Sequence, residues 1–312
     1  MSLPVIAIVV TCYNEEAAVA RLLGLLDRMS ADGLVSPDSY ILCSNDGSRD
    51  GTWGVIERLH ADDKRLKGIS LAHNRGHQYA LLAGLMAVKD LCDAAVSIDA
   101  DLQDDPEAIV EMVKLFVQGK EIVYGVRSSR ATDTWFKRTT AHAFYSLQHR
   151  MGLDTVYDHA DYRLMSRRAL ELLGEYGESN LFLRGIVPQI GLDTAVVTYE
   201  RHERVAGESK YPLAKMLSFS IDGITSFSAK PIRIIFVVGL VLLLIDVLVA
   251  IYIFSSYFAH STIDGWTSIM LSVWFLGSLI LMSIGVVGEY IGKIFNEVKH
   301  RPRFAIRDRL WD

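Results

Sequence analysis

The sequence predicts an α/β fold, with a mostly parallel sheet domain over residues 1–211 followed by membrane-associated helices. Short apolar runs alternate with stretches of helical spacing from residue 1 to about 200, and this alternation places helices on both faces of a parallel sheet. Polar residues follow the ends of several of these runs. Two long apolar segments, 234–258 and 265–288, lie near the C-terminus, and a span of about 20 residues is enough to cross a bilayer.

The elements of the predicted sheet domain begin with a buried strand at residues 5–10. This run is too short and has the wrong flanks for a signal peptide. The further strands are expected at 40–43, 67–72, 94–98 and 121–125, and the helices at 15–29, from 52, at 77–90 and at 105–118. Ligands of such sheets bind at the carboxyl ends of the strands, and the polar turns of this sequence fall there.

The composition excludes several classes of protein. Half of the 312 residues are hydrophobic and the net charge is -5, which rules out a disordered chain and gives no electrostatic reason to expect nucleic acid as a partner. Cys12, Cys43 and Cys92 lie in apolar runs without CxxC spacing. We expect them to be small core residues in a reducing compartment rather than metal or redox groups. Neither a GxGxxG nor a GxxxxGK[ST] motif occurs, which argues against a dinucleotide oxidoreductase and a P-loop NTPase.

The membrane region is predicted at residues 231–292, as two helices at about 232–257 and 266–290. Their connection carries no Lys or Arg, whereas basic residues precede the first span and follow the second. Because basic flanks stay in the cytoplasm, both termini are expected to be cytosolic, with 293–312 as a basic cytosolic tail. Asp246, the one charge of the first span, is expected to be protonated, paired or packed against another helix, as in an oligomer. Two buried helices of a soluble protein are the alternative.

Residues 212–230 connect the sheet domain to the first span. Their large apolar residues are interspersed with Ser, Lys and Asp, which is typical of amphipathic helices that lie in the membrane interface. An ordinary amphipathic helix of a soluble protein is the alternative. The sequence therefore predicts a domain that is held close to the membrane surface.

Asp99 and Asp101 directly follow the predicted strand at 94–98. Their i,i+2 spacing puts both carboxylates on one side of the strand end, where two like charges are costly unless a cation neutralises them. Mg²⁺ or Mn²⁺, held by a few protein oxygens and by substrate phosphates, fits this pair. Gln103 can add a neutral oxygen or hold a metal-bound water. Such Asp pairs also occur in plain solvated turns, and it is the position after a buried strand that favours the metal site.

Motifs along essentially the whole chain resemble family 2 glycosyltransferases with a GT-A fold. The motifs that carry this resemblance are 13–15, 45–52, 99–107 and 161–166. Within that family, 207–211 and 288–292 with 301–302 resemble the polyprenyl-phosphate glycosyltransferases, which include bactoprenol glucosyltransferases and dolichol-phosphate mannose synthases. One departure is Thr11-Cys12, where the family often has a proline. The QxxRW motif of the processive polysaccharide synthases is absent.

The resemblance implies a nucleotide-sugar donor. Its base and ribose would be bound by Tyr13, Glu15 and Asp46, and its diphosphate would lie on the metal held by Asp99 and Asp101. A simple Asx-turn is the alternative role for Asp46. Arg75 would add positive charge near the diphosphate, or would face solvent.

The resemblance also implies a polyprenyl phosphate, such as undecaprenyl phosphate, as the acceptor. Arg204 and Lys210 are expected to bind its phosphate near the membrane-proximal helix, since Arg grips two phosphate oxygens at once. A solvated basic loop attracted to anionic lipid is the alternative. Arg127, together with Arg130, and Arg163 are further candidates for contact with the acceptor phosphate.

In the implied reaction an acceptor phosphate oxygen attacks the anomeric carbon of the sugar and displaces a nucleoside diphosphate, with inversion. Asp101, through the metal, and Arg204 are expected to stabilise the charge that develops. Asp161 matches the position that is commonly called the base. An acceptor phosphate has a second pKa of about 6 and is already mostly ionised at neutral pH. We therefore expect Asp161 to orient a sugar hydroxyl or a basic side chain such as Arg163, and to accept a proton only from a monoanionic acceptor.

The sequence thus predicts a polyprenyl-phosphate hexosyltransferase that modifies lipopolysaccharide or another cell-envelope glycan. It would be a multi-pass, homo-oligomeric protein of the bacterial inner membrane, with UDP-glucose as the first choice of donor. GDP-mannose, UDP-galactose or an N-acetylated sugar are alternative donors. A non-catalytic membrane scaffold is the alternative of a different class.

Overall fold

The structure, a computed structural model, describes most of the chain. The described residues are 3–12, 19–100, 103–127, 159–178, 181–199 and 265–311, with isolated helical positions between 235 and 248. The chain divides into two compact units. The first comprises residues 1–142, 154–210 and 301–312, and the second comprises 143–153 and 211–300.

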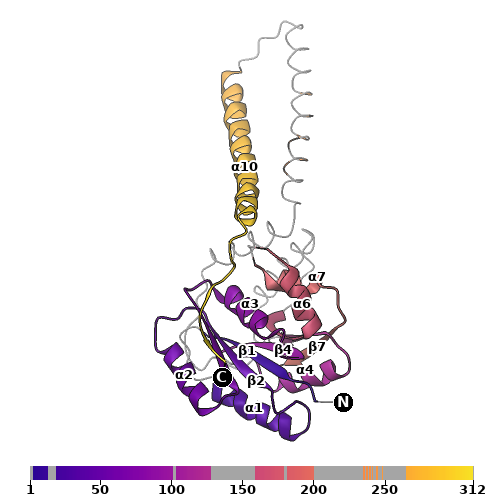
Figure 1. The fold of residues 1–312 in the computed structure, drawn as a ribbon. Coiled ribbons are helices and arrows are strands. Elements are labelled where there is room, and N and C mark those ends of the chain that lie inside the picture. The colour runs from indigo at the N-terminus through magenta and orange to yellow at the C-terminus, as the bar shows by residue number, and fades with distance from the viewer. Residues whose placement is uncertain are drawn as a thin grey trace. The chain divides into compact units, whose positions relative to one another are not determined.

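The first unit is built on an eight-stranded sheet (Figure 1). Its strands are β1 Ile6–Cys12, β2 Tyr40–Asn45, β3 Leu66–Leu71, β4 Ala94–Asp99, β5 Ile122–Arg127, β6 His159–Ser166, β7 Thr194–Tyr199 and β8 Ile306–Leu310. They lie in the order β7-β5-β6-β4-β1-β2-β3-β8. Four of the seven described pairings are parallel. This confirms the predicted mostly parallel sheet of an α/β domain, in which β6 and β8 run antiparallel to their neighbours.

Among the described residues of the first unit, six helices cover the two faces of the sheet. They are α1 Val19–Ala31, α2 Thr52–Asp62, α3 His77–Val88, α4 Ala108–Val117, α6 Arg167–Glu175 and α7 Leu183–Gln189. In Figure 1, α1, α2 and α4 lie on one face, and α3, α6 and α7 lie on the other. The helices expected at 77–90 and from 52 begin at the predicted residues.

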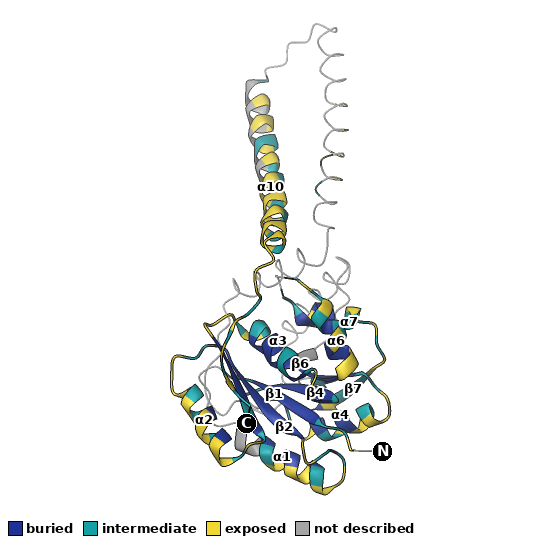
Figure 2. Ribbon diagram, in the orientation of Figure 1, coloured by how far each residue is buried: buried dark blue, intermediate teal, exposed yellow. Residues whose placement is uncertain are grey.

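The core lies on both faces of the central strands, which are the dark blue strands of Figure 2. Residues Ile6 to Val10 of β1 are fully buried, because helices pack against the strand from both sides and the run has no polar residue to expose. Cys12, Cys43 and Cys92 are buried, which confirms them as core residues.

The C-terminal segment differs from the prediction of a basic tail over 293–312. Residues 293–298 belong to a long helix, and β8 pairs antiparallel with β3 as an edge strand of the sheet. Arg307 and Arg309 of β8 are exposed and alternate with half-buried neighbours, so the basic residues form the solvent side of a strand. The indole of Trp311 packs edge-on against the ring of Tyr40, with 6.5 Å between the ring centroids. The tail is therefore an integral part of the sheet domain.

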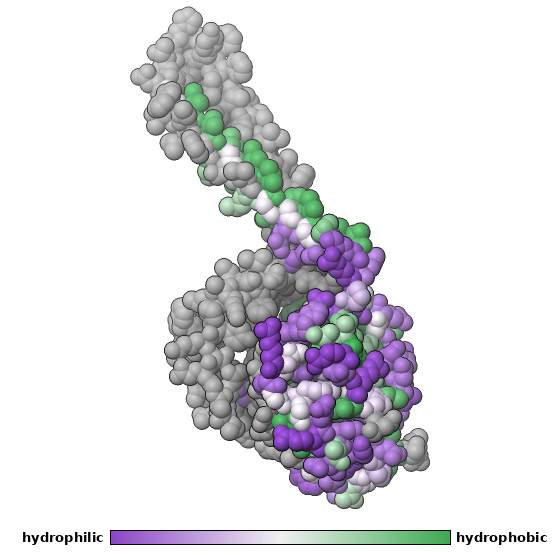
Figure 3. Space-filling view, turned by 60° about the vertical axis from the view of Figure 1, so that its left-hand side comes forward, coloured by the Kyte–Doolittle hydropathy of each residue, from purple (hydrophilic) through white to green (hydrophobic). Residues whose placement is uncertain are grey.

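The second unit contains α10, Trp266–Val298. An 18-residue window of its segment Phe275–Val298 has a mean hydropathy of 1.7, and none of this window is buried. Among the described residues, α10 is the one helix that is long and apolar enough to cross a membrane. Figure 3 shows hydrophobic side chains along α10 and hydrophilic ones toward its C-terminal end. The helix continues beyond the predicted end at 290. The interfacial segment 212–230 lies outside the described residues, as does most of the span predicted at 232–257, including Asp246, so the two-helix hairpin is not shown.

Candidate active site

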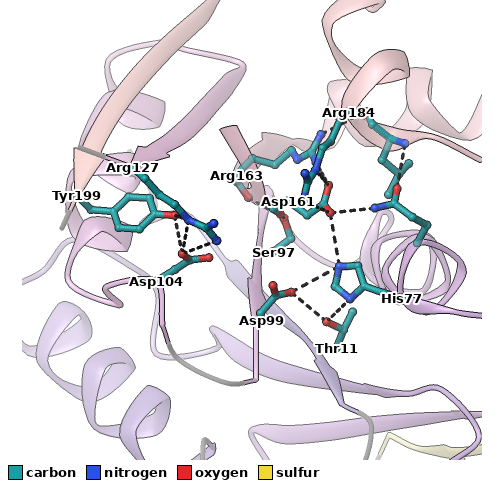
Figure 4. Close-up of polar contacts among 12 residues, drawn as sticks. Thr11, His77, Ser97, Asp99, Asp104, Arg127, Asp161, Arg163, Arg184 and Tyr199 are labelled. Atoms are coloured by element: carbon teal, nitrogen blue, oxygen red, sulfur yellow. Dashed lines mark hydrogen bonds and ion pairs between the residues drawn. The ribbon is translucent and has the colours of Figure 1, made fainter. Parts of the chain in front are cut away.

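One edge of the sheet gathers the polar side chains of the candidate site. The parallel strands β1 and β4 both end there, at Cys12 and Asp99, and Thr11 is the partner of Asp99 in the strand register. Strand β6 is antiparallel to β4, so its first residues, including Asp161, lie beside the end of β4. Helix α3 begins at the same edge with His77. The reversal of β6 is therefore what brings Asp161 to the site (Figure 4).

Asp99 presents the accessible carboxylate of the site, with 41% of its side chain exposed. Its Oδ1 lies 3.5 Å from the donating hydroxyl of Thr11 and 3.5 Å from Nε2 of His77. The Thr11 hydroxyl is in turn 3.2 Å from Nδ1 of His77. The imidazole thus links the ends of β1 and β4 (Figure 4), and it holds the Asp99 carboxylate in place at the end of β4.

Asp161 is the buried carboxylate of the site, only 5% exposed. Its Oδ1 accepts a hydrogen bond of 2.5 Å from Nη2 of Arg163, and its Oδ2 accepts one of 2.9 Å from Nε2 of Gln78. Arg184 adds a second guanidinium, with Nη2 3.2 Å from Oδ2. The Nε2 atom of His77 lies 3.6 Å from Oδ2. Both oxygens of Asp161 are therefore occupied by donors, most of them basic.

These contacts fix the protonation state of Asp161. Burial by itself raises the pKa of this carboxyl, but the hydrogen bond from His77 and the charges of Arg184 and Arg163 outweigh burial and hold the pKa well below its usual range. An efficient general base has a pKa near the working pH. The geometry therefore supports the pairing with a basic side chain, and not base catalysis, as the role of Asp161.

The pKa of His77 is shifted in the opposite direction. Burial lowers it, but the hydrogen bond with Asp161 and the charges of Asp99 and Asp161 raise it, and the net shift is upward. An imidazole between two carboxylates is stabilised in its protonated form. His77 therefore adds positive character between the two acidic groups.

Arg163 does not fit its predicted role as a ligand of the acceptor phosphate. It is 1% exposed, and its Nη1 donates to the backbone oxygen of Leu183 at 3.4 Å while its Nη2 holds Asp161. A guanidinium so enclosed has no open side for a phosphate. The exposed guanidinium beside Asp161 belongs to Arg184, whose side chain is 44% exposed.

Asp46 joins two loops at the carboxyl ends of β2 and β3. Its buried carboxylate accepts from the backbone amides of Arg75 and Gly76, both at 2.8 Å. The side chain that bonds the local backbone of this turn is that of Asn45, whose Oδ1 accepts from the amide of Ser48, three residues on, at 3.2 Å. The carboxylate of Asp46 thus holds the loop that leads into α3.

The two loops are also in direct backbone contact. Gly47 has a φ of +62°, and a Cβ there would lie 2.6 Å from the carbonyl carbon of His73, so only glycine fits. The side chain of Arg75 points to the C-terminal segment, with Nη2 3.5 Å from the backbone oxygen of Pro302. Its predicted contribution to diphosphate binding stays a prediction.

A second cluster fixes the loop that follows Asp99. Arg127 pairs with the buried carboxylate of Asp104 at 3.1 Å, and the hydroxyl of Tyr199 donates to the same carboxylate at 2.6 Å (Figure 4). The hydroxyl of Tyr162 donates to the backbone oxygen of Asp105 at 2.9 Å. Arg127 is therefore tied to this loop, and its contact with the acceptor phosphate stays a prediction.

The residues present fit part of the predicted metal site. Asp99 supplies an accessible hard oxygen donor, the kind that Mg²⁺ and Mn²⁺ prefer, and Gln103 is buried in the same loop. Within the described residues no three His, Cys, Asp or Glu side chains come together as a metal site. Six predicted residues lie outside the described part of the chain: Tyr13, Glu15, Asp101, Arg130, Arg204 and Lys210.

Three residues of the site, His77, Gln78 and Arg184, are not among those predicted from the sequence. His77 and Gln78 begin a helix that directly follows a polar strand end, which is a position where ligand-binding residues of α/β sheets are found. This signal was available in the sequence. Arg184 has no such signal, because its place depends on the antiparallel course of β6 and on the return of α7 to that strand.

Comparisons with known proteins agree with this architecture. The family model described as "Glycosyl transferase family 2" matches residues 7–174, more than half of the chain. The chain therefore belongs to glycosyltransferase family 2 and is a glycosyltransferase.

Relatives cover the whole chain. The uncharacterized glycosyltransferase YkoT of Bacillus subtilis (strain 168) is 50% identical over 100% of this chain and 94% of its own length. The bactoprenol glucosyl transferase of Shigella phage SfV is 37% identical over 97% of this chain and 98% of its own length. Among solved structures, mannosyl-3-phosphoglycerate synthase from Rubrobacter xylanophilus is 18% identical, with a TM-score of 0.47 over 72% of this chain and 73% of that chain. The last likeness carries no inference about the site.

Proposed function

We propose that the protein transfers a hexose from a nucleotide sugar, with UDP-glucose as the first candidate, to undecaprenyl phosphate at the cytosolic face of a bacterial membrane. One observation carries the proposal: an open carboxylate, Asp99, and a cation-rich cluster around Asp161 lie at the same edge of the sheet. Such a site suits two anionic substrates, one bound through a divalent cation and one bound by basic side chains. Relatives of full length that are named bactoprenol glucosyl transferase support the choice of acceptor.

On the donor side, Asp99 would be a ligand of Mg²⁺ or Mn²⁺, together with Asp101 and Gln103. Such an ion supplies Lewis-acid stabilisation of a leaving diphosphate. Thr11 and His77 keep the Asp99 carboxylate in place through their contacts at 3.5 Å. Tyr13, Glu15 and Asp46 are proposed to bind the nucleoside, with Asp46 acting at least in part through the loop that it holds.

On the acceptor side, the chain has little need of a base. The phosphate of the acceptor is mostly ionised at neutral pH, since its second pKa is about 6. An unpaired carboxylate beside it would repel it, but Asp161 is paired with Arg163 and Arg184. Asp161 is therefore proposed to order basic side chains, and Arg204 and Lys210 are proposed to bind the lipid phosphate from the membrane side.

The strand order of the sheet supports a membrane hairpin. Strand β8 follows α10 in the chain and pairs with β3. The sheet strands that precede and follow α10 in the chain, β7 and β8, must therefore lie on one side of any membrane. If α10 crosses the bilayer, the chain must cross an even number of times between β7 and β8. We propose the second crossing at 232–257, with both termini cytosolic.

The membrane topology is tested with two epitope tags, one at the C-terminus and one in the connection at 259–264. In inverted membrane vesicles the C-terminal tag is expected to be accessible to antibody and the connection tag protected, and the reverse is expected in right-side-out spheroplasts. Accessibility of both tags from the same side would contradict the hairpin.

The activity is tested by transfer of radiolabelled sugar to undecaprenyl phosphate with the full-length protein in detergent or nanodiscs. UDP-glucose with Mg²⁺ or Mn²⁺ is expected to give labelled lipid, and EDTA is expected to abolish it. GDP-mannose, UDP-galactose and UDP-N-acetylglucosamine form the donor panel. Turnover with another donor would keep the chemistry and change the sugar, whereas no turnover with any donor would favour the scaffold.

A further inference from the structure

The cluster around Asp161 holds more positive than negative charge. One carboxylate contacts two guanidinium groups, those of Arg163 and Arg184, and His77 lies within 3.6 Å as well. A buried ion pair is stable when its charges balance. Asp99 lies on the other side of His77, so two carboxylates face two guanidinium groups and one imidazole. With the imidazole protonated, the cluster has a surplus of one positive charge that an anion can balance.

The surplus charge is available on Arg184. Arg163 is enclosed and bound on two sides, whereas the side chain of Arg184 is 44% exposed. Arg184 contacts Asp161 through Nε, at 3.4 Å, and Nη2, at 3.2 Å. Within the described part of the chain its Nη1 has no hydrogen-bond partner. A guanidinium held along one edge in this way still offers donors to two phosphate oxygens.

The position of Arg184 is fixed in advance. The backbone amide of the preceding residue, Leu183, donates to Oε1 of Gln78 at 3.0 Å, and its oxygen accepts from Nη1 of Arg163. Gln78 also donates to Asp161 at 2.9 Å. Since the backbone before Arg184 and one edge of its guanidinium are both held, little conformational entropy is lost when an anion binds.

The place of Arg184 relative to Asp99 indicates which anion it binds. His77 separates the two carboxylates, 3.5 Å from Asp99 on one side and 3.6 Å from Asp161 on the other, and Arg184 contacts Asp161 (Figure 4). A displacement with inversion at the anomeric carbon needs the leaving diphosphate and the attacking phosphate on opposite sides of the sugar. With the diphosphate at Asp99, the attacking phosphate belongs on the side of Asp161.

The geometry points to Arg184 as the residue that binds the attacking phosphate monoester of the acceptor, with Asp161 and Gln78 as the positioning residues that hold it. This inference rests on the proposed function, in which the acceptor is a lipid phosphate. It replaces Arg163, the buried neighbour, with Arg184 as the phosphate ligand next to Asp161.

The test compares Arg184→Gln and Arg184→Lys with the wild type. For Arg184→Gln, kcat/KM for undecaprenyl phosphate is expected to fall about 10- to 100-fold, the usual size of a lost charged hydrogen bond, through a raised KM for the acceptor. The KM for UDP-glucose is expected to stay within about twofold. Arg184→Lys keeps the charge without the planar guanidinium. Its kcat/KM for undecaprenyl phosphate is expected to lie between the values of the wild type and of Arg184→Gln.

A binding measurement separates phosphate recognition from a merely structural role. Wild-type protein is expected to bind farnesyl phosphate more tightly than farnesol, and Arg184→Gln is expected to lose this difference while keeping the affinity for farnesol. Arg168→Gln is the matched control, because Arg168 is 68% exposed on α6 and pairs only loosely with Glu121 at 3.6 Å. The control is expected to keep both affinities and both KM values.

Three results would overturn the inference. The first is an unchanged KM for the acceptor in Arg184→Gln. The second is a raised KM for UDP-glucose alone, which would assign Arg184 to the donor phosphates. The third is an unchanged preference of Arg184→Gln for farnesyl phosphate over farnesol. If Arg184→Gln fails to fold, Arg184→Lys answers the same three questions. Absence of transfer by the wild type with every donor would instead refute the proposed function.

Discussion

Asp99 and Asp161 are the same chemical group at the same edge of the sheet, yet their surroundings differ. Asp99 ends a parallel strand with 41% of its side chain exposed and one imidazole nearby. Asp161 lies near the start of an antiparallel strand, is 5% exposed, and is held by two guanidinium groups and an amide. The open carboxylate is suited to hold a cation that arrives with a substrate. The closed, buried carboxylate of Asp161 is already paired with Arg163 and Arg184, so its role is to orient these side chains.

Removal of the open carboxylate is expected to have the largest effect. In Asp99→Asn the proposed metal loses an anionic ligand, and transfer is expected to fall about a thousandfold, the upper range for loss of one charge-stabilising group. Initial rates with saturating Mn²⁺ measure this. Asp90→Asn is the matched control, because Asp90 is 72% exposed near the far end of α3, and it is expected to keep full activity. Equal activity of both variants would remove Asp99 from the site.

Neutralisation of the closed carboxylate is expected to have the next largest effect. Asp161→Asn removes the charge that orients Arg163 and Arg184, and kcat/KM for the acceptor is expected to fall about 100-fold, within the range for loss of a positioning interaction. Steady-state kinetics with varied undecaprenyl phosphate measure it. A fall in donor kcat/KM alone would show that Asp161 serves the donor side.

Stability is expected to separate the two guanidinium groups. Arg163→Met leaves the buried charge of Asp161 with one partner fewer, and removing one partner of a buried pair typically costs about 3 to 5 kcal/mol. Arg184→Gln affects a half-exposed pair and is expected to cost about 1 kcal/mol or less. Thermal unfolding in detergent is expected to show a much lower midpoint for Arg163→Met. Equal unfolding midpoints of the two variants would mean that the buried Arg163 contributes no more to stability than the half-exposed Arg184.

The C-terminal strand is expected to show the smallest effect. Trp311→Ala removes an edge-on contact with Tyr40 and a cation–π contact with Lys67, whose Nζ lies 5.1 Å from the indole ring. A loss of about 1 kcal/mol is expected, seen as a midpoint lower by a few degrees with unchanged kcat. A large loss of activity would indicate that the strand acts on the site and not only on the sheet.

The open half of the site could be predicted from the sequence, because local pattern determines it. Asp99 follows a buried apolar run, and the end of a parallel strand is where such sheets bind ligands. The closed half depends on contacts between distant segments. Nothing in the sequence around residues 159–166 shows that β6 runs antiparallel to β4, and this direction is what brings Asp161 and Arg184 to the end of β4.

The same limit explains two further differences. From the sequence, Arg163 is expected to be a surface cation close to Asp161. Only the fold shows that Arg163 is buried and that it contacts Leu183 of α7. The basic residues of 293–312 suggest a tail, and only the pairing with β3 shows that they are the outer side of a strand. Charge predicts exposure on average, but it does not show which charged side chains a fold encloses.

The pH dependence of Asp161→Asn tests the central claim, that Asp161 orders cations and is not a base. The pKa of Asp161 is held well below its usual range, so its charge and the stability that it contributes are fully present above about pH 4, the unfolded value, and are lost only in stronger acid. Because Asp161 also raises the pKa of His77, the comparison is made in a His77→Gln background, where no imidazole titrates at this position. There the ratio of kcat/KM without the Asp161→Asn substitution to kcat/KM with it is expected to stay constant from pH 6 to 9. A deficit that disappears toward pH 9, where the acceptor phosphate is fully ionised, would establish Asp161 as a base and contradict this account.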